Sequence, residues 1–545
     1  MLSSSHLQWS RGRILLFLAA LCALLFFYRL DARDFETTDE ARRALVVRAM
    51  IESGDYVIPT LSGQVYLKKP PLYYWLAAIT SRVADSTDEW VYRLPSALGA
   101  LGSVLLLFLL ADRLLDRRAA MIASVTLATC TIFLIRGSRA QIDMTLTLLV
   151  LAAMLCLERA RAARWTGWAP WGFWIALGFA FLAKGPAGLL FPIGAALALA
   201  AGPGFLNEVR RMRPGRGLLV ILAIVLPWGI AVLKSVGVDS ALGILAEEAF
   251  GGFNETGVRH REPFLFYLYE TPAQFLPWCL FLPAALLALR EVKTAAEGAA
   301  LRFAGAWILP ALIVLSLSHQ KRSFYLLPAF GALAIWHGWT VDRFLLSPAT
   351  DTEHPLTRKA ARLGLTAICA LAVMGALAGG AYLHAREPEI FAPLSIPLAA
   401  IGLWALYALV SFRRGRPGRA LATVVIVVLI CVAAQRGPLA VWYNQHKSAR
   451  IFAQQIANAV PADADLLTLY QDWHSIEAYL GRPIRRIDSD KGLRRRLAQE
   501  EPVYVLLREN FYDELQPLFR RVVLRSEDSR RKGSRIVLAS NQRRR

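Results

Sequence analysis

Three charged residues near the start of the chain have the spacing of one helix face. Asp39, Arg42 and Arg43 are three and four positions apart, so in a helix their side chains would be neighbours. A carboxylate can orient or deprotonate a hydroxyl, and a guanidinium binds phosphate oxygens in pairs. Taken alone, the stretch is equally consistent with an ordinary salt bridge on a helix surface.

Other ionisable residues stand at the ends of long apolar segments, where a charge is costly and often functional. The segments alternate in direction, which places these residues on one face of a membrane with Asp39. They are Glu40, Lys68, Lys69, Arg139, Asp143, Lys184, Glu247, Glu248, Arg259, His260, Arg261, His319, Lys321 and Arg322, with Tyr325 close behind. Many cations beside few carboxylates predict an outer-face cavity for an anionic, phosphorylated substrate that arrives in the lipid.

The composition requires a membrane protein. The chain has 545 residues, of which 56% are hydrophobic and only 19% are charged. These values exclude a soluble enzyme, a disordered chain and a fibrous one. The six cysteines lie far apart inside apolar segments, so we expect packing residues and neither disulfides nor a structural zinc site.

The apolar segments predict about thirteen transmembrane helices. They are 14–28, 92–113, 118–135, 144–158, 168–183, 186–201, 217–236, 264–288, 303–318, 323–340, 363–384, 393–412 and 420–435. We interpret the first as a retained anchor and not as a cleaved signal peptide, because no small-residue cleavage pattern follows it directly.

The positive charge predicts the orientation of these helices. Arg11 and Arg13 place the N-terminus in the cytoplasm, and Lys and Arg then gather in the inside loops. The net charge of +21 is therefore mostly a topology signal, and we do not expect nucleic-acid binding. The loop 29–91 and the tail after 435 fall on the outer, periplasmic side of a bacterial inner membrane.

Two segments are predicted to form structure outside the membrane. Within a transmembrane domain over 1–435, the first loop (29–91) predicts surface helices. One begins at Asp39, capped by Thr37 or Thr38, and ends at Gly54. The other is a short apolar stretch at 71–83, too short to span, with Tyr73, Tyr74 and Trp75 at the level of the lipid headgroups.

The tail, residues 436–545, predicts a small α/β domain. Candidate strands are 466–470, 483–487, 503–507, 522–524 and 536–539, and candidate helices are 475–480, 492–500 and 511–517. Asp472, Trp473 and His474 stand at a strand end. A turn capped by the aspartate is the preferred interpretation there, and a ligand site is the alternative.

Several segments together resemble the glycosyltransferase C superfamily, and within it the bacterial 4-amino-4-deoxy-L-arabinose lipid A transferases, relatives of the protein O-mannosyltransferases. The resemblance depends on their order along the chain: 39–42 (Asp-Glu-Ala-Arg), 66–75 (Tyr-Leu-Lys-Lys-Pro-Pro-Leu-Tyr-Tyr-Trp), 93–96, 142–144, 182–185, 260–263, 276–278 and 321–328. It implies an enzyme that takes a sugar from a polyprenyl-phosphate carrier and passes it to lipid A, another glycolipid, an envelope glycan or a protein.

The resemblance also implies roles for individual residues. Asp39 would be catalytic and Asp143 also required. Carrier phosphate would be bound by Arg42 and Lys69, with Tyr66 and Tyr325 lining its site. The charge pattern adds Lys184 and Arg322 as further phosphate ligands, and Glu40, Lys68, Arg259 and His260 as candidates on the acceptor side.

One departure bears on metal binding. The arabinose transferases have glutamate where this chain has Lys68, and in that family this glutamate can hold a metal ion with a histidine of the later outer loop. A lysine ammonium offers no lone pair, so we expect no metal through His260 and no other cofactor.

The predicted mechanism is an inverting transfer by a monomer in contact with membrane lipids. Cations stabilise the leaving phosphate while Asp39 orients or deprotonates the acceptor hydroxyl. The alternatives are a flippase for lipid-linked oligosaccharides, a polysaccharide ligase, a protein O-mannosyltransferase, and an assembly protein without enzymatic activity. Convergence of Asp39, Arg42 and Lys69 on one cavity would favour a transferase.

Overall fold

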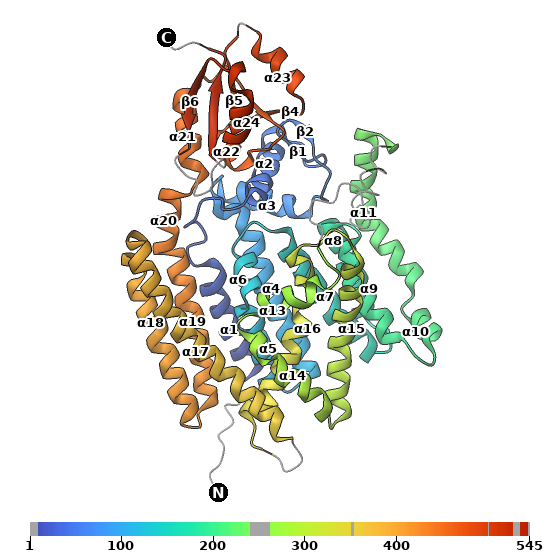
Figure 1. Cartoon of the computed structure of the whole chain (residues 1–545). Helices are drawn as coiled ribbons and strands as arrows, with labels where there is room; N and C mark the ends of the chain where they lie inside the picture. Colours follow the sequence, from blue (N-terminus) through green and yellow to red (C-terminus); the bar gives the residue numbers. More distant parts are fainter. Residues whose placement is uncertain are drawn as a thin grey trace.

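The computed structural model describes residues 9–239, 243, 262–349, 354–499, 501–526 and 535–542. A bundle of helices forms the body of the molecule, and a small domain with a β-sheet stands at one end of it (Figure 1). Two helices of the first loop, α2 (Thr38–Ser53) and α3 (Leu72–Ala84), lie between the bundle and this domain (Figure 1).

Seven helical stretches in the described part of the chain are long and apolar enough to cross a membrane. Two bent pairs raise the number to as many as nine: α5 (Arg117–Thr129) with α6 (Thr131–Gly137), bent by 59°, and α13 (Phe266–Gln274) with Trp278–Glu291, bent by 112°. Five of the seven are single helices: α4 (Glu89–Leu114), α11 (Pro214–Val236), α15 (Ala295–Leu317), α17 (Pro355–Arg386) and α18 (Pro388–Arg413). The sixth, Ser323–Leu346, consists of η5 (Ser323–Ala329), α16 (Phe330–Val341) and η6 (Asp342–Leu346). The seventh, Pro417–Ala459, begins with α19 (Pro417–Arg436).

Each of the thirteen predicted segments coincides with one or more helices, but four of them do not meet the criteria for a full span. Three are short: α1 (Arg11–Cys22), which continues into the π-helix η1 (Ala23–Phe27), α8 (Ala169–Lys184) and α9 (Ala187–Ala200). The fourth, α7 (Ile142–Ala162), has an aspartate in its first turn and two arginines in its last. The bundle therefore contains short and charged helices whose ends meet inside the protein.

The first loop folds as predicted around α2 (Thr38–Ser53). The Thr37 hydroxyl accepts a hydrogen bond from the Glu40 amide, and Gly54 ends the helix with a φ of 72°. A hairpin of β1 (Thr60–Leu61) and β2 (Gln64–Val65) leads to α3 (Leu72–Ala84). Tyr73 and Tyr74 of this helix are buried against the protein and do not face the surroundings. Leu76, Ile79 and Val83 form the exposed face of α3 instead.

The C-terminal domain is a five-stranded mixed sheet with helices on both faces. The strand order is β4-β3-β5-β7-β6, parallel across β4, β3 and β5 and antiparallel beyond. Side chains of α21 (Ala449–Ala459) pack on one face, and those of α23 (Asp490–Leu497) and α24 (Glu509–Leu515) pack on the other. All five predicted strands are present: β3 (Asp465–Leu469), β4 (Arg485–Ile487), β5 (Val503–Arg508), β6 (Arg521–Arg525) and β7 (Ile536–Ser540).

This domain is attached to the first loop by α22 (His474–Leu480). The Tyr479 hydroxyl accepts from the Phe35 amide at 2.6 Å and donates to Glu89 at 2.7 Å. His474 is 5% exposed and lies beside Glu477, while Asp472 pairs with Arg486 at 3.1 Å. These contacts are internal to the domain, but the predicted aspartate cap was wrong: Trp473 precedes the helix, no side chain caps it, and Asp472 pairs with the arginine instead. The remaining described helices are α10 (Phe205–Arg211), η3 (Trp278–Phe281), α14 (Leu282–Ala288), η4 (Leu289–Glu291), α20 (Pro438–His446) and η7 (Gln516–Leu518).

Candidate active site

The first turn of α2 presents a carboxylate between two guanidiniums. Asp39 Oδ1 lies 3.1 Å from Arg42 Nη1, and Asp39 Oδ2 lies 3.5 Å from Arg322 Nη1. The Arg42 contact follows from helical spacing. The Arg322 contact depends on the tertiary fold. Arg322 occupies the position just before η5, and the packing of η5 in the bundle brings it to Asp39. All three side chains are partly exposed, which leaves them accessible to a substrate.

Arg43 attaches the same turn to the start of α7. Its Nη1 donates to the backbone oxygens of Asp39 at 3.0 Å and Ala140 at 2.8 Å. Burial raises the pKa of Asp39, but the nearby guanidiniums of Arg43, Arg42, Arg322 and Arg136 outweigh burial and hold that pKa below its usual value. Asp39 is therefore an anion at any physiological pH.

A second carboxylate lies at the base of this cluster. Asp143, in the first turn of α7, has a side chain only 3% exposed and forms an ion pair with Lys184, the last residue of α8. The Lys184 ammonium also lies 4.5 Å from the centre of the Tyr325 ring. Lys184 thus links a buried acid to the residue that sequence reasoning placed near the carrier phosphate.

Arg136 completes the cluster and was missed by the sequence interpretation. It ends the bent pair α5–α6, and its guanidinium carbon lies 3.9 Å from the centre of the Phe324 ring. Its charge acts on both Asp39 and Asp143. The available signal was an arginine directly after the apolar segment 118–135, seven positions before Asp143.

The cluster carries an excess of positive charge. Five cations surround two carboxylates, which leaves three positive charges uncompensated within the group: Arg42, Arg43, Arg136, Lys184 and Arg322 against Asp39 and Asp143. Such an excess is unfavourable without an anion and is suited to a phosphate group.

The 66–70 segment borders this cluster. A side chain at Gly185, next to Lys184, would approach Pro70 Cγ at 4.0 Å, which places the Lys69–Pro70 step beside the end of α8. Burial and the neighbouring Tyr66 hydroxyl raise the pKa of Tyr74. Lys69 and Tyr66 are half-buried, whereas Lys68 is exposed.

Glu40 belongs to the supporting structure. It is fully buried, and its Oε1 accepts from Arg93 Nε and from the Ala140 amide, each at 3.1 Å. The neighbours Asp39 and Glu40 therefore point to different surroundings. Arg259 and His260 lie outside the described residues.

Metal binding finds no support in the described ranges. No group of three His, Cys, Asp or Glu side chains there is close enough to hold a metal ion. The Asp39 and Asp143 carboxylates are instead occupied by basic side chains.

Comparison with known proteins gives a consistent picture. A family model described as dolichyl-phosphate-mannose-protein mannosyltransferase matches residues 68–230. A protein of Pseudomonas aeruginosa strain LESB58, named undecaprenyl phosphate-alpha-4-amino-4-deoxy-L-arabinose arabinosyl transferase, is 30% identical over 461 residues, 82% of this chain and 79% of that protein. A protein of the same name from Pectobacterium carotovorum is 29% identical over 405 residues, 73% and 71% of the two chains.

Solved structures share the fold. The structure of ArnT from Cupriavidus metallidurans bound to undecaprenyl phosphate aligns with a TM-score of 0.75 at 20% identity, covering 98% of this chain and 99% of that one. The apo oligosaccharyltransferase of Archaeoglobus fulgidus aligns with a TM-score of 0.52 at 14% identity, covering 93% and 70%. The sequence match over most of both chains shows that this chain belongs to the family of undecaprenyl phosphate-aminoarabinose arabinosyl transferases, which are multi-pass glycosyltransferases of the inner membrane.

Proposed function

We propose that the chain transfers 4-amino-4-deoxy-L-arabinose from undecaprenyl phosphate to lipid A at the outer face of the inner membrane. The observation that carries this proposal is the cluster in which five cations surround Asp39 and Asp143. The relatives' name supplies the donor, and the cluster supplies groups that suit its phosphate.

The cations would bind the donor phosphate and stabilise it as a leaving group. In the transfer, the bond between the sugar's anomeric carbon and the phosphate oxygen breaks, and the phosphate leaves with the electron pair. Arg42, Lys69 and Arg322 are the cations proposed to meet the developing charge, with Lys184 and Tyr325 beside them. In other enzymes, one preorganised hydrogen-bond donor that faces a developing anion lowers the activation free energy by about 2.7–4 kcal/mol.

Asp39 would act on the acceptor. In the unliganded protein it is held by Arg42 and Arg322 and is a weak base. A bound phosphate competes for both guanidiniums, and the pKa of Asp39 then rises toward its usual value. The carboxylate can then orient the acceptor oxygen and take its proton as that oxygen bonds to the anomeric carbon from the opposite side, with inversion.

The remaining predicted residues have supporting places in this proposal. Asp143 would hold Lys184 in position, and Tyr66 would line the phosphate site with Tyr325. Lys68, which is exposed, remains a candidate contact for the acceptor, as do Arg259 and His260. We propose that the protein acts as a monomer.

The proposal includes an orientation in which the N-terminus is cytoplasmic and the C-terminal domain is periplasmic. This follows from the gathering of Lys and Arg in the loops opposite the cluster. Labelling of introduced cysteines at Lys447 and at Arg414 with a membrane-impermeant maleimide tests it. Only the first should react in intact spheroplasts.

Protein O-mannosylation is a second candidate, favoured by the family-model match over residues 68–230. Mass spectrometry of lipid A and of envelope proteins separates the two, in a strain that lacks the gene and in the same strain complemented with it. We expect a mass increase of lipid A by the aminoarabinose residue on complementation with the wild type and none with Asp39→Asn. Unchanged lipid A with altered protein glycans would support the second candidate and contradict the first.

A further inference from the structure

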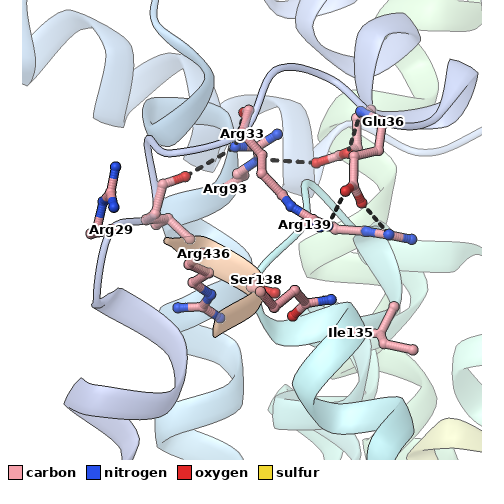
Figure 2. A pocket seen from close by; sticks show the side chains of 11 residues that line it. Arg29, Arg33, Glu36, Arg93, Ile135, Ser138, Arg139 and Arg436 are labelled. Carbon is pink, nitrogen blue, oxygen red and sulfur yellow. Dashed lines mark hydrogen bonds and ion pairs between the residues drawn. The ribbon is translucent and has the colours of Figure 1, made fainter. Parts of the chain in front are cut away.

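A second cationic pocket lies on the other side of the first turn of α2. It contains five arginines and two glutamates (Figure 2). Its lining residues are Arg29, Leu30, Arg33, Glu36, Glu40, Arg93, Ile135, Ser138, Arg139, Gln435 and Arg436. None of them is a cation of the Asp39 cluster, so the two sites are chemically separate.

The two carboxylates of this pocket are already paired. Arg33 and Arg139 both form ion pairs with Glu36, and Figure 2 shows them approaching it from two sides. Arg93 pairs with Glu40 at 3.1 Å. Five guanidiniums against two carboxylates leave three positive charges uncompensated among the lining residues.

Two of the arginines are committed to the backbone. Arg436 donates to the carbonyl oxygens of Leu25 and Tyr28, at 2.7 and 2.8 Å, and Arg93 donates to those of Leu30, Arg33 and Asp34. These bonds hold the end of the first membrane helix in place, but neutral carbonyls do not cancel the charges.

Unused donors remain at Arg29 and Arg33. Within the described ranges, the exposed Arg29 guanidinium has neither a hydrogen bond nor an ion pair. Arg33 Nε is buried and makes no hydrogen bond there. Arg29 lies on the opposite side of the pocket from Glu36, away from the two paired carboxylates (Figure 2).

The position of the pocket indicates where the anion comes from. Arg436 is the last residue of α19, Arg29 follows η1, Arg93 is in the second turn of α4, and Arg139 follows α6. The pocket is therefore formed by the ends of four membrane helices, all at the same face of the bundle. This is the level at which lipid phosphates lie, so the local concentration of lipid headgroups exceeds that of any dissolved anion.

We infer that this pocket binds the phosphate of a membrane lipid headgroup, with Arg29 and Arg33 as its available ligands. The inference does not rest on the proposed transfer reaction, since none of these side chains belongs to the Asp39 cluster. Ala140 lies between the two sites, because its amide donates to Glu40 while its carbonyl accepts from Arg43. A headgroup held in the pocket would therefore lie close to the reaction site.

Lipid binding to the purified, delipidated protein tests the inference. Native mass spectrometry would follow binding of dioleoyl phosphatidylglycerol, diphosphoryl lipid A or inorganic phosphate, with saturating undecaprenyl phosphate present to occupy the donor site. Dioleoylglycerol is the lipid control without phosphate. We expect the double variant Arg29→Gln with Arg33→Gln to bind phosphate-bearing lipid at least tenfold more weakly than the wild type, whereas the double lysine variant stays within about threefold.

Two controls separate a local effect from a general one. Arg414→Gln removes the same charge beyond the other end of the 20-residue α19, about 30 Å away, and should bind as the wild type does. Should the double variant fail to fold, Arg29→Gln alone serves, since that guanidinium has no hydrogen bond or ion pair to lose among the described residues. Its expected loss is about threefold.

The probes also identify the source of the phosphate. Binding of lipid A alone supports an acceptor-type glycolipid, and binding of phosphatidylglycerol as well supports a general phospholipid. The inference is overturned if inorganic phosphate binds while neither lipid does. It is also overturned if dioleoylglycerol binds as tightly as the phosphorylated lipids, or if the glutamine variants bind as the wild type does.

Discussion

The Asp39 carboxylate lies 3.5 Å from the Arg322 guanidinium, although 283 positions separate them in the chain. Helical spacing explains the other partner, Arg42, but only the tertiary fold supplies Arg322. An acid held by one cation of its own helix and one from a distant segment is poised to release both to a phosphate.

Replacement of Asp39 by asparagine should abolish transfer without unfolding the protein. The side chain is 25% exposed, so the neutral amide is tolerated, but the anion that orients the acceptor is lost. Activity should fall by about 10²–10⁴-fold. The measurement is sugar transfer in proteoliposomes together with the midpoint of thermal unfolding. Asp85→Asn makes the same chemical change in the exposed, left-handed residue after α3 and should retain full activity. An active Asp39→Asn enzyme would contradict the assignment.

The pH dependence of Arg322→Gln should differ from that of the wild type. Arg322 is one of the groups that lower the pKa of Asp39, so its loss raises that pKa. Because a lowered pKa means that the anion persists as pH falls, the wild type should keep its activity and the stability contributed by Asp39 until the pH drops below the usual carboxyl pKa, about 3.9. In the variant, the acidic limb of kcat/KM against pH, which reports the free enzyme, should move to higher pH. An acidic limb at the same pH in both proteins would disprove this coupling.

Asp143 and Lys184 should be coupled in stability. Both are largely buried, so removal of one partner leaves an uncompensated charge, at a cost of about 3–5 kcal/mol. Lys184→Met and Asp143→Asn should each lower the unfolding midpoint strongly, and the double variant should recover much of the loss without recovering transfer. Additive effects of the two substitutions would argue against a direct pair.

Glu40→Gln should damage folding where Asp39→Asn does not. Glu40 is fully buried and accepts from Arg93 and from the Ala140 amide, so the amide side chain loses an ion pair inside the protein. We expect a lower yield of folded protein and a lower unfolding midpoint. Glu52→Gln, at an exposed position of the same helix, is the matched control and should behave as the wild type does. Equal midpoints for the two variants would contradict a structural role for Glu40.

Chelation should leave the activity unchanged. The described residues offer no group of three metal-binding side chains, and the Lys68 ammonium has no lone pair for a metal ion. Transfer should be the same after dialysis against EDTA, and added zinc should not increase it. Loss of activity that zinc restores would show a metal ligand set outside the described residues.

Local chemistry made much of the fold predictable. The cap at Thr37 and the glycine at position 54 set the ends of α2, and the alternation of strands and helices in the tail gave all five strands of the sheet. Apolar segments located the membrane helices, because the hydrocarbon core selects long apolar sequences whatever their neighbours are. The length of such a segment did not show that α5–α6 and α13–α14 are bent.

The sequence by itself determined that this is a membrane protein with its chemistry at one face, and it identified Asp39 and Arg42 as neighbours. Only the tertiary structure decided which side of α2 each acid faces. Successive residues of a helix are about 100° apart, so Asp39 meets Arg322 while Glu40 turns to Arg93. It also buried Tyr73 and Tyr74, brought Arg136 to the cluster and assembled the second arginine pocket. Those contacts join segments far apart in the chain, and local sequence patterns carry no information about which distant segments pack together.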